Sequence, residues 1–167
     1  MDIYDRKGRL IIPDPARLER LGPQKGVKSL ERKILYEQLY CPLGHSLIKP
    51  GAPLFDEKPG IEIFCSGKSG QQIVYLSPFQ NDPRKNFEFE FGKGEVLNLM
   101  CPSCHAPFPI LAPHDCTPQA MYVMLFLDDK RDFNNSVCVC NAWNCYASFL
   151  RISGDILAEV RYQNFVP

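Results

Sequence analysis

Residues 97–105 read LNLMCPSCH, and this short stretch determines how the rest of the chain is interpreted. An apolar run ends here in two cysteines, Cys101 and Cys104, with two residues between them. Thiolates at this spacing can enter one tetrahedral coordination sphere while the backbone between them turns. Pro102 suits the turn, because its ring fixes φ and it has no N–H to leave unpaired. The stretch predicts half of a metal site, of the zinc-knuckle type.

A redox-active pair is the rival interpretation, because Cys-Pro-x-Cys also resembles the motif of glutaredoxin-like oxidoreductases. In that family the motif leads into a helix, whose N-terminal dipole lowers the thiol pKa. Here Pro107 and Pro109 follow at once, and each would remove a helix hydrogen bond and clash with the preceding turn. We therefore expect no helix after Cys104 and no redox pair.

Length and charge limit the function classes. A chain of 167 residues forms one compact domain or two small lobes. Its 19 acidic residues balance its 19 basic residues, so no overall field draws it to nucleic acid or to an anionic membrane. The first residues, MDIYDRK, lack the apolar core of a secretory signal, and no apolar run is long enough to span a membrane. We expect a cytoplasmic protein with no membrane segment.

Eight cysteines in such a chain are expected to be metal ligands or buried thiols, since the cytosol keeps thiols reduced. Export by another route would instead allow four disulfides. The short spacings 101/104, 138/140 and 140/145 favour metal, because they bring ligands together locally.

Residues 1–32 read as an extended arm with at most one short helix, Ala16 to Leu21, which Gly22 and Pro23 end. The arm carries too little apolar surface for a core of its own. It either lies across its own domain or docks on a partner protein.

A first knuckle is predicted at Cys41-Pro42-Leu43-Gly44-His45, which echoes residues 101–105. Cys41 and His45 could both be ligands, with Gly44 giving the turn its backbone freedom. Alternatively, Cys41 is a buried thiol and His45 an exposed turn residue. In the second knuckle Cys104 already supplies a ligand, so we expect the neighbouring His105 to face water or to act behind the ligands.

Residues 33–95 alternate like a β meander. Two strands, 61–65 and 72–76, flank a Gly-containing hairpin loop that lacks the spacing of a phosphate-binding loop. The run Phe87-Glu88-Phe89-Glu90-Phe91 has period two and predicts a strand with aromatics inward and carboxylates outward. The two carboxylates are not expected to form an acid/base pair.

Residues 96–167 predict further strands at 121–127, 137–140, 146–152 and 156–162. Strands that alternate with cysteine-bearing turns resemble the zinc-ribbon family, in which two such turns clamp one ion. The resemblance covers residues 96 to 152 and implies that Cys101, Cys104, Cys140 and Cys145 share one zinc ion. Four residues separate Cys140 from Cys145, where the family has two. That departure also argues against an iron site of the rubredoxin type, so zinc is preferred to iron.

The remaining cysteines leave alternatives open. Cys138 could replace Cys140, because residues two apart face the same side of a strand. Cys65 and Cys116 could complete a second zinc site with Cys41 and His45, or each could be a buried thiol. The segment His114-Asp115-Cys116 resembles a thiol-protease dyad in composition only, since such residues normally come from separate parts of a fold.

The fold class predicted is mainly β: a small antiparallel domain with one or two zinc-ribbon-like knuckles and the N-terminal arm. A metal held by four thiolates has no open position and contributes folding free energy instead of chemistry. We therefore expect no catalytic residues. The function expected is that of an accessory or small subunit, docked through its arm on a larger cytoplasmic assembly.

Two other functions remain as alternatives. An iron-thiolate site would support electron transfer or thiol redox chemistry. A nucleic-acid-binding ribbon is disfavoured by the neutral charge. It would use basic and aromatic residues such as Arg84, Lys85, Phe87, Trp143 and Arg151.

Overall fold

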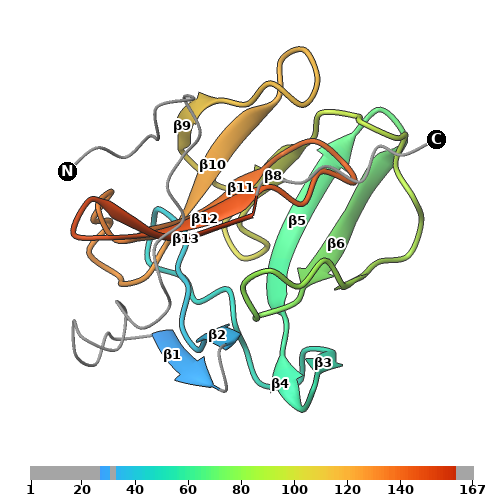
Figure 1. Cartoon of the computed structure of the whole chain (residues 1–167). Coiled ribbons are helices and arrows are strands. Elements are labelled where there is room, and N and C mark those ends of the chain that lie inside the picture. The colour runs from blue at the N-terminus through green and yellow to red at the C-terminus, as the bar shows by residue number, and fades with distance from the viewer. Residues whose placement is uncertain (1–26, 31–32, 161–167) are drawn as a thin grey trace.

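The computed structural model describes the backbone of residues 27–30 and 33–160 and the side chains of residues 34–156. Within these ranges every paired strand is antiparallel and no helix occurs, which confirms the mainly β fold (Figure 1). The predicted arm helix, Ala16 to Leu21, lies outside the described residues.

The C-terminal half forms a five-stranded sheet in the order β13-β12-β11-β10-β9. The predicted run 121–127 becomes an interior strand, as its apolar composition indicates. The strands are β9 (Ile110–Pro113), β10 (Met121–Phe126), β11 (Ser136–Cys140), β12 (Ser148–Ile152) and β13 (Asp155–Val160).

A second sheet has four strands in the order β7-β6-β5-β8. Its centre is the predicted hairpin, closed at Gly67 and Gly70, where Gly70 has a φ of 131°. The strands are β5 (Ile61–Gly67), β6 (Gly70–Leu76), β7 (Lys85–Asn86) and β8 (Asn98–Met100). Two short hairpins lie outside both sheets: β1 (Val27–Leu30) with β2 (Lys33–Tyr36), and β3 (Leu54–Phe55) with β4 (Lys58–Pro59).

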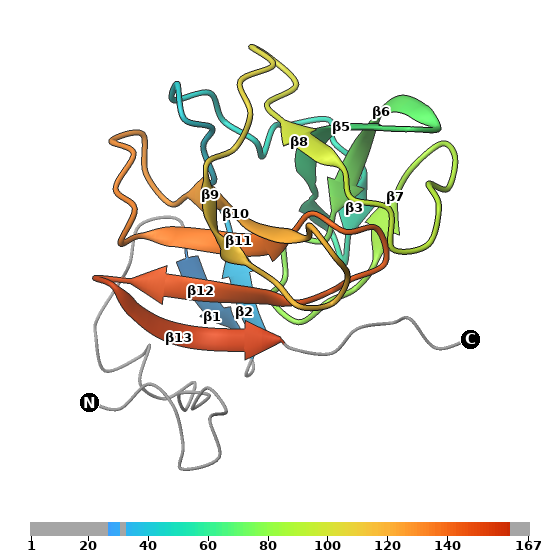
Figure 2. The same cartoon turned by 90° about the horizontal axis from the view of Figure 1, so that it is seen from above.

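One hydrophobic core joins the two sheets. It contains Ile63 and Val74 from the four-stranded sheet and Leu125, Val137 and Leu150 from the five-stranded sheet. Viewed from above, the two sheets lie beside each other (Figure 2). This core therefore includes residues from both of the regions that the sequence suggested, 33–95 and 96–167.

The segment Phe87–Phe91 is not a strand, so that prediction was wrong. Its aromatics still alternate inward, because Phe87 and Phe91 both pack edge-on against Trp143. The backbone of this segment is held by the buried side chain of Gln72, in the place where a strand would have a neighbouring strand. The Gln72 Oε1 accepts hydrogen bonds from the N–H groups of Glu88 and Phe89, and its Nε2 donates to the Phe89 carbonyl.

Candidate metal centres

Two groups of four Cys and His side chains converge in the described part of the chain. Site 1 consists of Cys41, His45, Cys101 and Cys104, and site 2 consists of His114, Cys116, Cys140 and Cys145. Within each group the potential ligand atoms all lie within 4.8 Å of one another. Each group therefore offers three thiols and one imidazole to a single ion.

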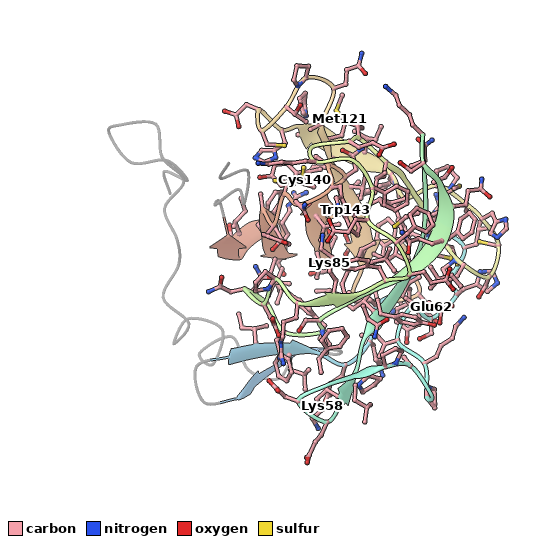
Figure 3. The ribbon with its side chains drawn as sticks, turned by 90° about the vertical axis from the view of Figure 1, so that its right-hand side faces the viewer. Lys58, Glu62, Lys85, Met121, Cys140 and Trp143 are labelled. Carbon is pink, nitrogen blue, oxygen red and sulfur yellow. The ribbon has the colours of Figure 1, made fainter. Side chains whose placement is uncertain are left out.

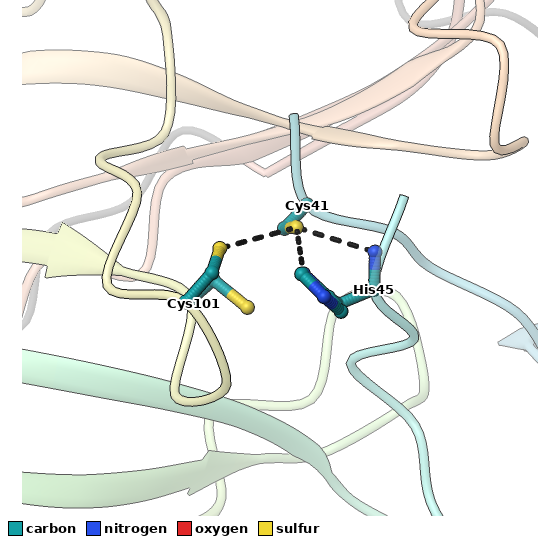
Figure 4. Close-up of side chains that lie close together, drawn as sticks. Cys41, His45 and Cys101 are labelled. Atoms are coloured by element: carbon teal, nitrogen blue, oxygen red, sulfur yellow. Dashed lines mark hydrogen bonds between the residues drawn. The ribbon is translucent and has the colours of Figure 1, made fainter. Parts of the chain in front are cut away.

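The strand β5 brings the two halves of site 1 together. The segment that leaves Cys41 and His45 attaches to the start of β5, where the Glu62 N–H donates to the Leu47 carbonyl at 2.8 Å. On β5 itself, Phe64 pairs with Met100, the last residue of β8. The two turns therefore emerge beside each other, and Figure 4 shows Cys41, His45 and Cys101 turned toward one another.

Backbone N–H groups donate hydrogen bonds to two of the sulfur atoms of site 1, those of Cys41 and Cys101. The Cys41 Sγ accepts hydrogen bonds at 3.3 Å from the N–H groups of Leu43 and His45. Burial nevertheless raises the pKa of Cys41, which these amides only partly oppose. At Cys101, burial also acts to raise the pKa, but hydrogen bonds from the amides of Cys104 and Ser103 and from the thiols of Cys41 and Cys104 together outweigh it, and the pKa lies below its usual value. Cys101 is therefore more ready than Cys41 to meet a cation as a thiolate.

Site 2 is built at one end of the five-stranded sheet. His114 directly follows β9, whose last residue, Pro113, pairs with Met121. The next residue of β10, Tyr122, pairs with Cys140 at the end of β11. Cys116 and Cys145 come from the two loops that leave this end of the sheet, β9–β10 and β11–β12.

The thiols of site 2 differ in their affinity for protons. A hydrogen bond from Cys140 lowers the pKa of Cys145 to about 6 and raises that of Cys140. Burial raises the pKa of Cys116 to about 11. Cys145 of site 2, like Cys101 of site 1, is thus a thiol whose pKa lies below its usual value. In addition, the Nε2 of His114 lies 3.7 Å from a carboxylate oxygen of Asp115, which leaves Nδ1 to face the sulfur atoms.

The separations match those of a tetrahedral zinc site. Zn–S bonds of about 2.3 Å and Zn–N bonds of about 2.05 Å place two sulfurs about 3.8 Å apart, and a sulfur and a nitrogen about 3.5 Å apart. In site 1, the Cys41 Sγ lies 3.9 Å from the Cys104 Sγ and 3.4 Å from the His45 Nδ1. In site 2, the Cys140 Sγ lies 3.6 Å from the Cys116 Sγ and 3.3 Å from the His114 Nδ1.

Disulfides are not present in either group. All eight cysteines are free, and the sulfur separations of 3.6 and 3.9 Å are far longer than an S–S bond of about 2.05 Å. The alternative of four disulfides is therefore not the arrangement in this structure.

The structure pairs the turns differently from the sequence analysis. Cys101 and Cys104 were expected to share one ion with Cys140 and Cys145, but the structure places these two pairs in different sites. Cys41 and His45 join the Cys101 turn, and Cys116 joins the Cys140 turn. The physical reason is that β8 pairs with β5, to whose start the segment after the Cys41 turn is hydrogen-bonded, while Cys140 ends a strand of the other sheet.

Three residues that the sequence offered as metal ligands or as neighbours of the ligands lie outside both groups: Cys65, Cys138 and His105. Cys65 is buried on β5, and Cys138 is buried with its Sγ 3.8 Å from the Ser136 Oγ. His105 is exposed and stacks on Phe64, with ring centroids 4.7 Å apart. His105 therefore lies apart from the ligand atoms, as the sequence analysis expected.

His114 is the candidate ligand that sequence reasoning missed. The pattern His-x-Cys at 114–116 was considered as a catalytic dyad and set aside, and Cys116 alone was considered as a zinc ligand, together with Cys41 and His45. Its signal was the position of His114 directly after a strand, with a second ligand type, Cys116, in the turn that follows. No pattern within residues 114–116 says which other turn they would meet.

Comparisons with protein-family models, with curated proteins and with solved structures find no match to this chain. In the described part of the chain, no helix is long and apolar enough to cross a membrane.

Proposed function

We propose that this protein is a two-zinc scaffold, which binds one structural zinc ion at site 1 and one at site 2 and has no catalytic centre of its own. The observation that carries the proposal is that four donor atoms converge within 4.8 Å in each of two separate groups. Four protein ligands fill the tetrahedral coordination of zinc and leave no position for water or substrate. The ions would then contribute free energy of folding.

The ligand set supports zinc in preference to iron. Each site offers three thiols and one imidazole, a set used by structural zinc sites. An iron site of the four-thiolate type would need a fourth cysteine in each group. In both groups the fourth donor within reach is a histidine nitrogen, His45 Nδ1 in site 1 and His114 Nδ1 in site 2.

Metal stoichiometry tests the proposal. The purified chain should contain about two zinc ions, measured by elemental analysis and by native mass spectrometry. Cys41→Ser and Cys116→Ser should each lower the content to about one ion, because the two residues belong to different sites. Cys138→Ser is the matched control, since Cys138 is a buried cysteine outside both groups, and it should retain two ions.

Two results would contradict the proposal. A red or brown protein that contains iron would replace the structural zinc sites with iron-thiolate chemistry. Loss of both ions in Cys41→Ser, with Cys116→Ser unaffected, would show that the two groups do not act as separate sites.

We further propose that the scaffold serves as an accessory subunit of a larger cytoplasmic assembly, with the N-terminal arm, residues 1–32, as the docking element. What supports this is that four protein ligands would fill the coordination of each ion, so the protein would act through contacts of its exposed surface. The nucleic-acid alternative has less support, because Arg84 is held by two carboxylates, those of Asp56 at 2.8 Å and Asp82 at 2.7 Å. Deletion of residues 1–26 leaves β1 in place and should preserve both zinc ions while weakening the complex, measured by co-purification with cross-linking.

A further inference from the structure

A cavity of about 120 Å³ lies between the two sheets, beside site 2. One wall comes from the four-stranded sheet, with Ile63, Val74 and Leu76, and the opposite wall includes Val139 and Trp143. The lining also includes the exposed residues 81 and 83, so the cavity reaches the protein surface there. Figure 3 shows Trp143 between Cys140 of site 2 and Lys85 of β7.

Most polar groups of the cavity wall already have partners. The Tyr36 hydroxyl donates to the Gln80 Oε1, and the Gln80 Nε2 donates to the Ser148 Oγ at 3.1 Å. The Ser77 hydroxyl donates to an Asp82 carboxylate oxygen at 2.6 Å. These groups therefore already have hydrogen-bond partners within the protein and need no ligand.

Trp143 and Lys85 supply two further hydrogen-bond donors among the lining residues. The Trp143 side chain is only 4% exposed, and its Nε1–H is the one buried side-chain N or O group in the described residues without a hydrogen-bond partner. A buried donor without an acceptor costs about 1–3 kcal/mol.

The second donor is Lys85. Its Nζ lies 3.7 Å from the centroid of the Trp143 ring and 3.5 Å from the Asn144 Oδ1. Among the described residues, no carboxylate lies within 4.0 Å of this ammonium group. Burial lowers the pKa of Lys85 to about 8, so most of the side chain is still charged at neutral pH.

We propose that this cavity binds a small monocarboxylic acid with an apolar body, its carboxylate at Lys85 and its apolar part among the aliphatic wall residues. The apolar walls disfavour a fully hydrated anion such as phosphate, because its remaining charge would have no partners. At about 120 Å³ the cavity is somewhat smaller than the engineered cavities of about 150 Å³ that hold benzene, so it suits at most a single small ring or a short branched chain.

The cavity is a binding site and not a site of thiol catalysis. Cys140 and Cys145 line it, but both are candidate ligands of site 2. Cys65 lines it too, and burial raises the pKa of this thiol to about 12. The thiol is therefore protonated at neutral pH and is a poor nucleophile. The ligand would leave the cavity chemically unchanged.

Trp143 is the only tryptophan in the chain, so its fluorescence reports directly on the cavity. We expect benzoate, added to the metal-bound full-length protein, to change this fluorescence saturably. The neutral isostere benzamide should bind at least tenfold more weakly, and inorganic phosphate should have no saturable effect. This comparison uses the unmodified protein and so does not depend on the folding of a variant.

A charge-deletion variant adds a second readout. Lys85→Met keeps the length of the side chain and should weaken benzoate binding at least tenfold, while Lys130→Met, at an exposed lysine, should bind like the unmodified protein. Equal affinity for benzoate and benzamide, equal affinity in Lys85→Met, or no saturable response to benzoate would each overturn the proposal. Zinc content is measured in the same samples, so failure of the ligand site is distinguished from failure of the metal sites.

Discussion

One histidine among three cysteines sets the charge of each candidate metal site. A zinc ion with three thiolates and one neutral imidazole carries a net charge of −1, whereas four thiolates would give −2. At site 1 the remaining charge is offset by amide dipoles, because the N–H groups of Leu43 and His45 both point at the Cys41 sulfur. At site 2 the Ala142 N–H lies 3.4 Å from the Cys140 sulfur and has the same effect. The amide-lined turns thus stabilise the thiolates that the metal requires.

His45 and His105, which occupy equivalent positions in the turns 41–45 and 101–105, should respond differently to substitution. His45→Ala removes a ligand from site 1, and we expect its zinc affinity to fall at least a hundredfold, because only three protein donors remain. His45→Cys should retain the ion, since it restores a fourth donor. Zinc affinity is measured by competition with a chromophoric chelator.

His105→Ala is the matched control for that prediction. His105 follows Cys104 as His45 follows Gly44, but its ring stacks on Phe64 and belongs to neither site. The variant should keep the zinc affinity of the unmodified protein. Loss of zinc in His105→Ala, with retention in His45→Ala, would show that the two histidines have exchanged roles.

At the scale of strands and turns, the local elements could be predicted from the sequence, but the way they meet could not. Alternation within residues 61–65 and 72–76 is a property of each strand, and both strands occur. The Cys-rich turns were also identified correctly as turns. Which turns share an ion depends on the pairing of β8 with β5, a contact between distant residues that no local spacing encodes.

The segment Phe87–Phe91 shows a second limit of structure prediction from the sequence. Its period of two predicted correctly which side chains face inward, but an inward alternation also arises where an extended segment follows a sheet without joining it. The side chain of Gln72 takes the hydrogen bonds that a neighbouring strand would otherwise make. A single buried amide thus replaces a strand pairing, and nothing in the local pattern around Gln72 indicates that role.

Gln72→Leu should therefore be strongly destabilising. The change removes the partner of two backbone N–H groups and one carbonyl, so we expect the free energy of unfolding to fall by about 2–4 kcal/mol. Chemical denaturation of the zinc-bound protein measures the change. Gln71→Leu is the control, because the adjacent side chain is exposed and contacts only the Ser66 hydroxyl, at 3.3 Å, among the hydrogen bonds of the described residues. Equal effects of the two variants would contradict this role of Gln72.

At the scale of the whole molecule, the two candidate metal sites bring together segments that are distant in sequence. Site 1 joins residues 41–45 to residues 101–104, and site 2 joins residues 114–116 to residues 140–145. The segment that leads into the Cys101 turn also pairs with the Cys140 loop, where the Leu97 N–H donates to the Asn141 carbonyl at 2.9 Å and the Trp143 N–H donates to the Glu95 carbonyl at 2.8 Å. Through these contacts each site supports the position of the other.

Removal of both ions should consequently unfold more than the two turns. We expect a strong chelator to abolish the near-ultraviolet circular dichroism of the aromatic cluster around Trp143, because Phe87 and Phe91 pack on a residue of the Cys140–Cys145 loop. The same treatment should collapse the dispersion of the amide NMR spectrum, and added zinc should restore both signals. The chelator already saturated with zinc is the control and should change neither. A metal-free protein that keeps its dispersed spectrum would show that the hydrophobic core alone holds the two sheets together, and that the ions add local rigidity without deciding the fold.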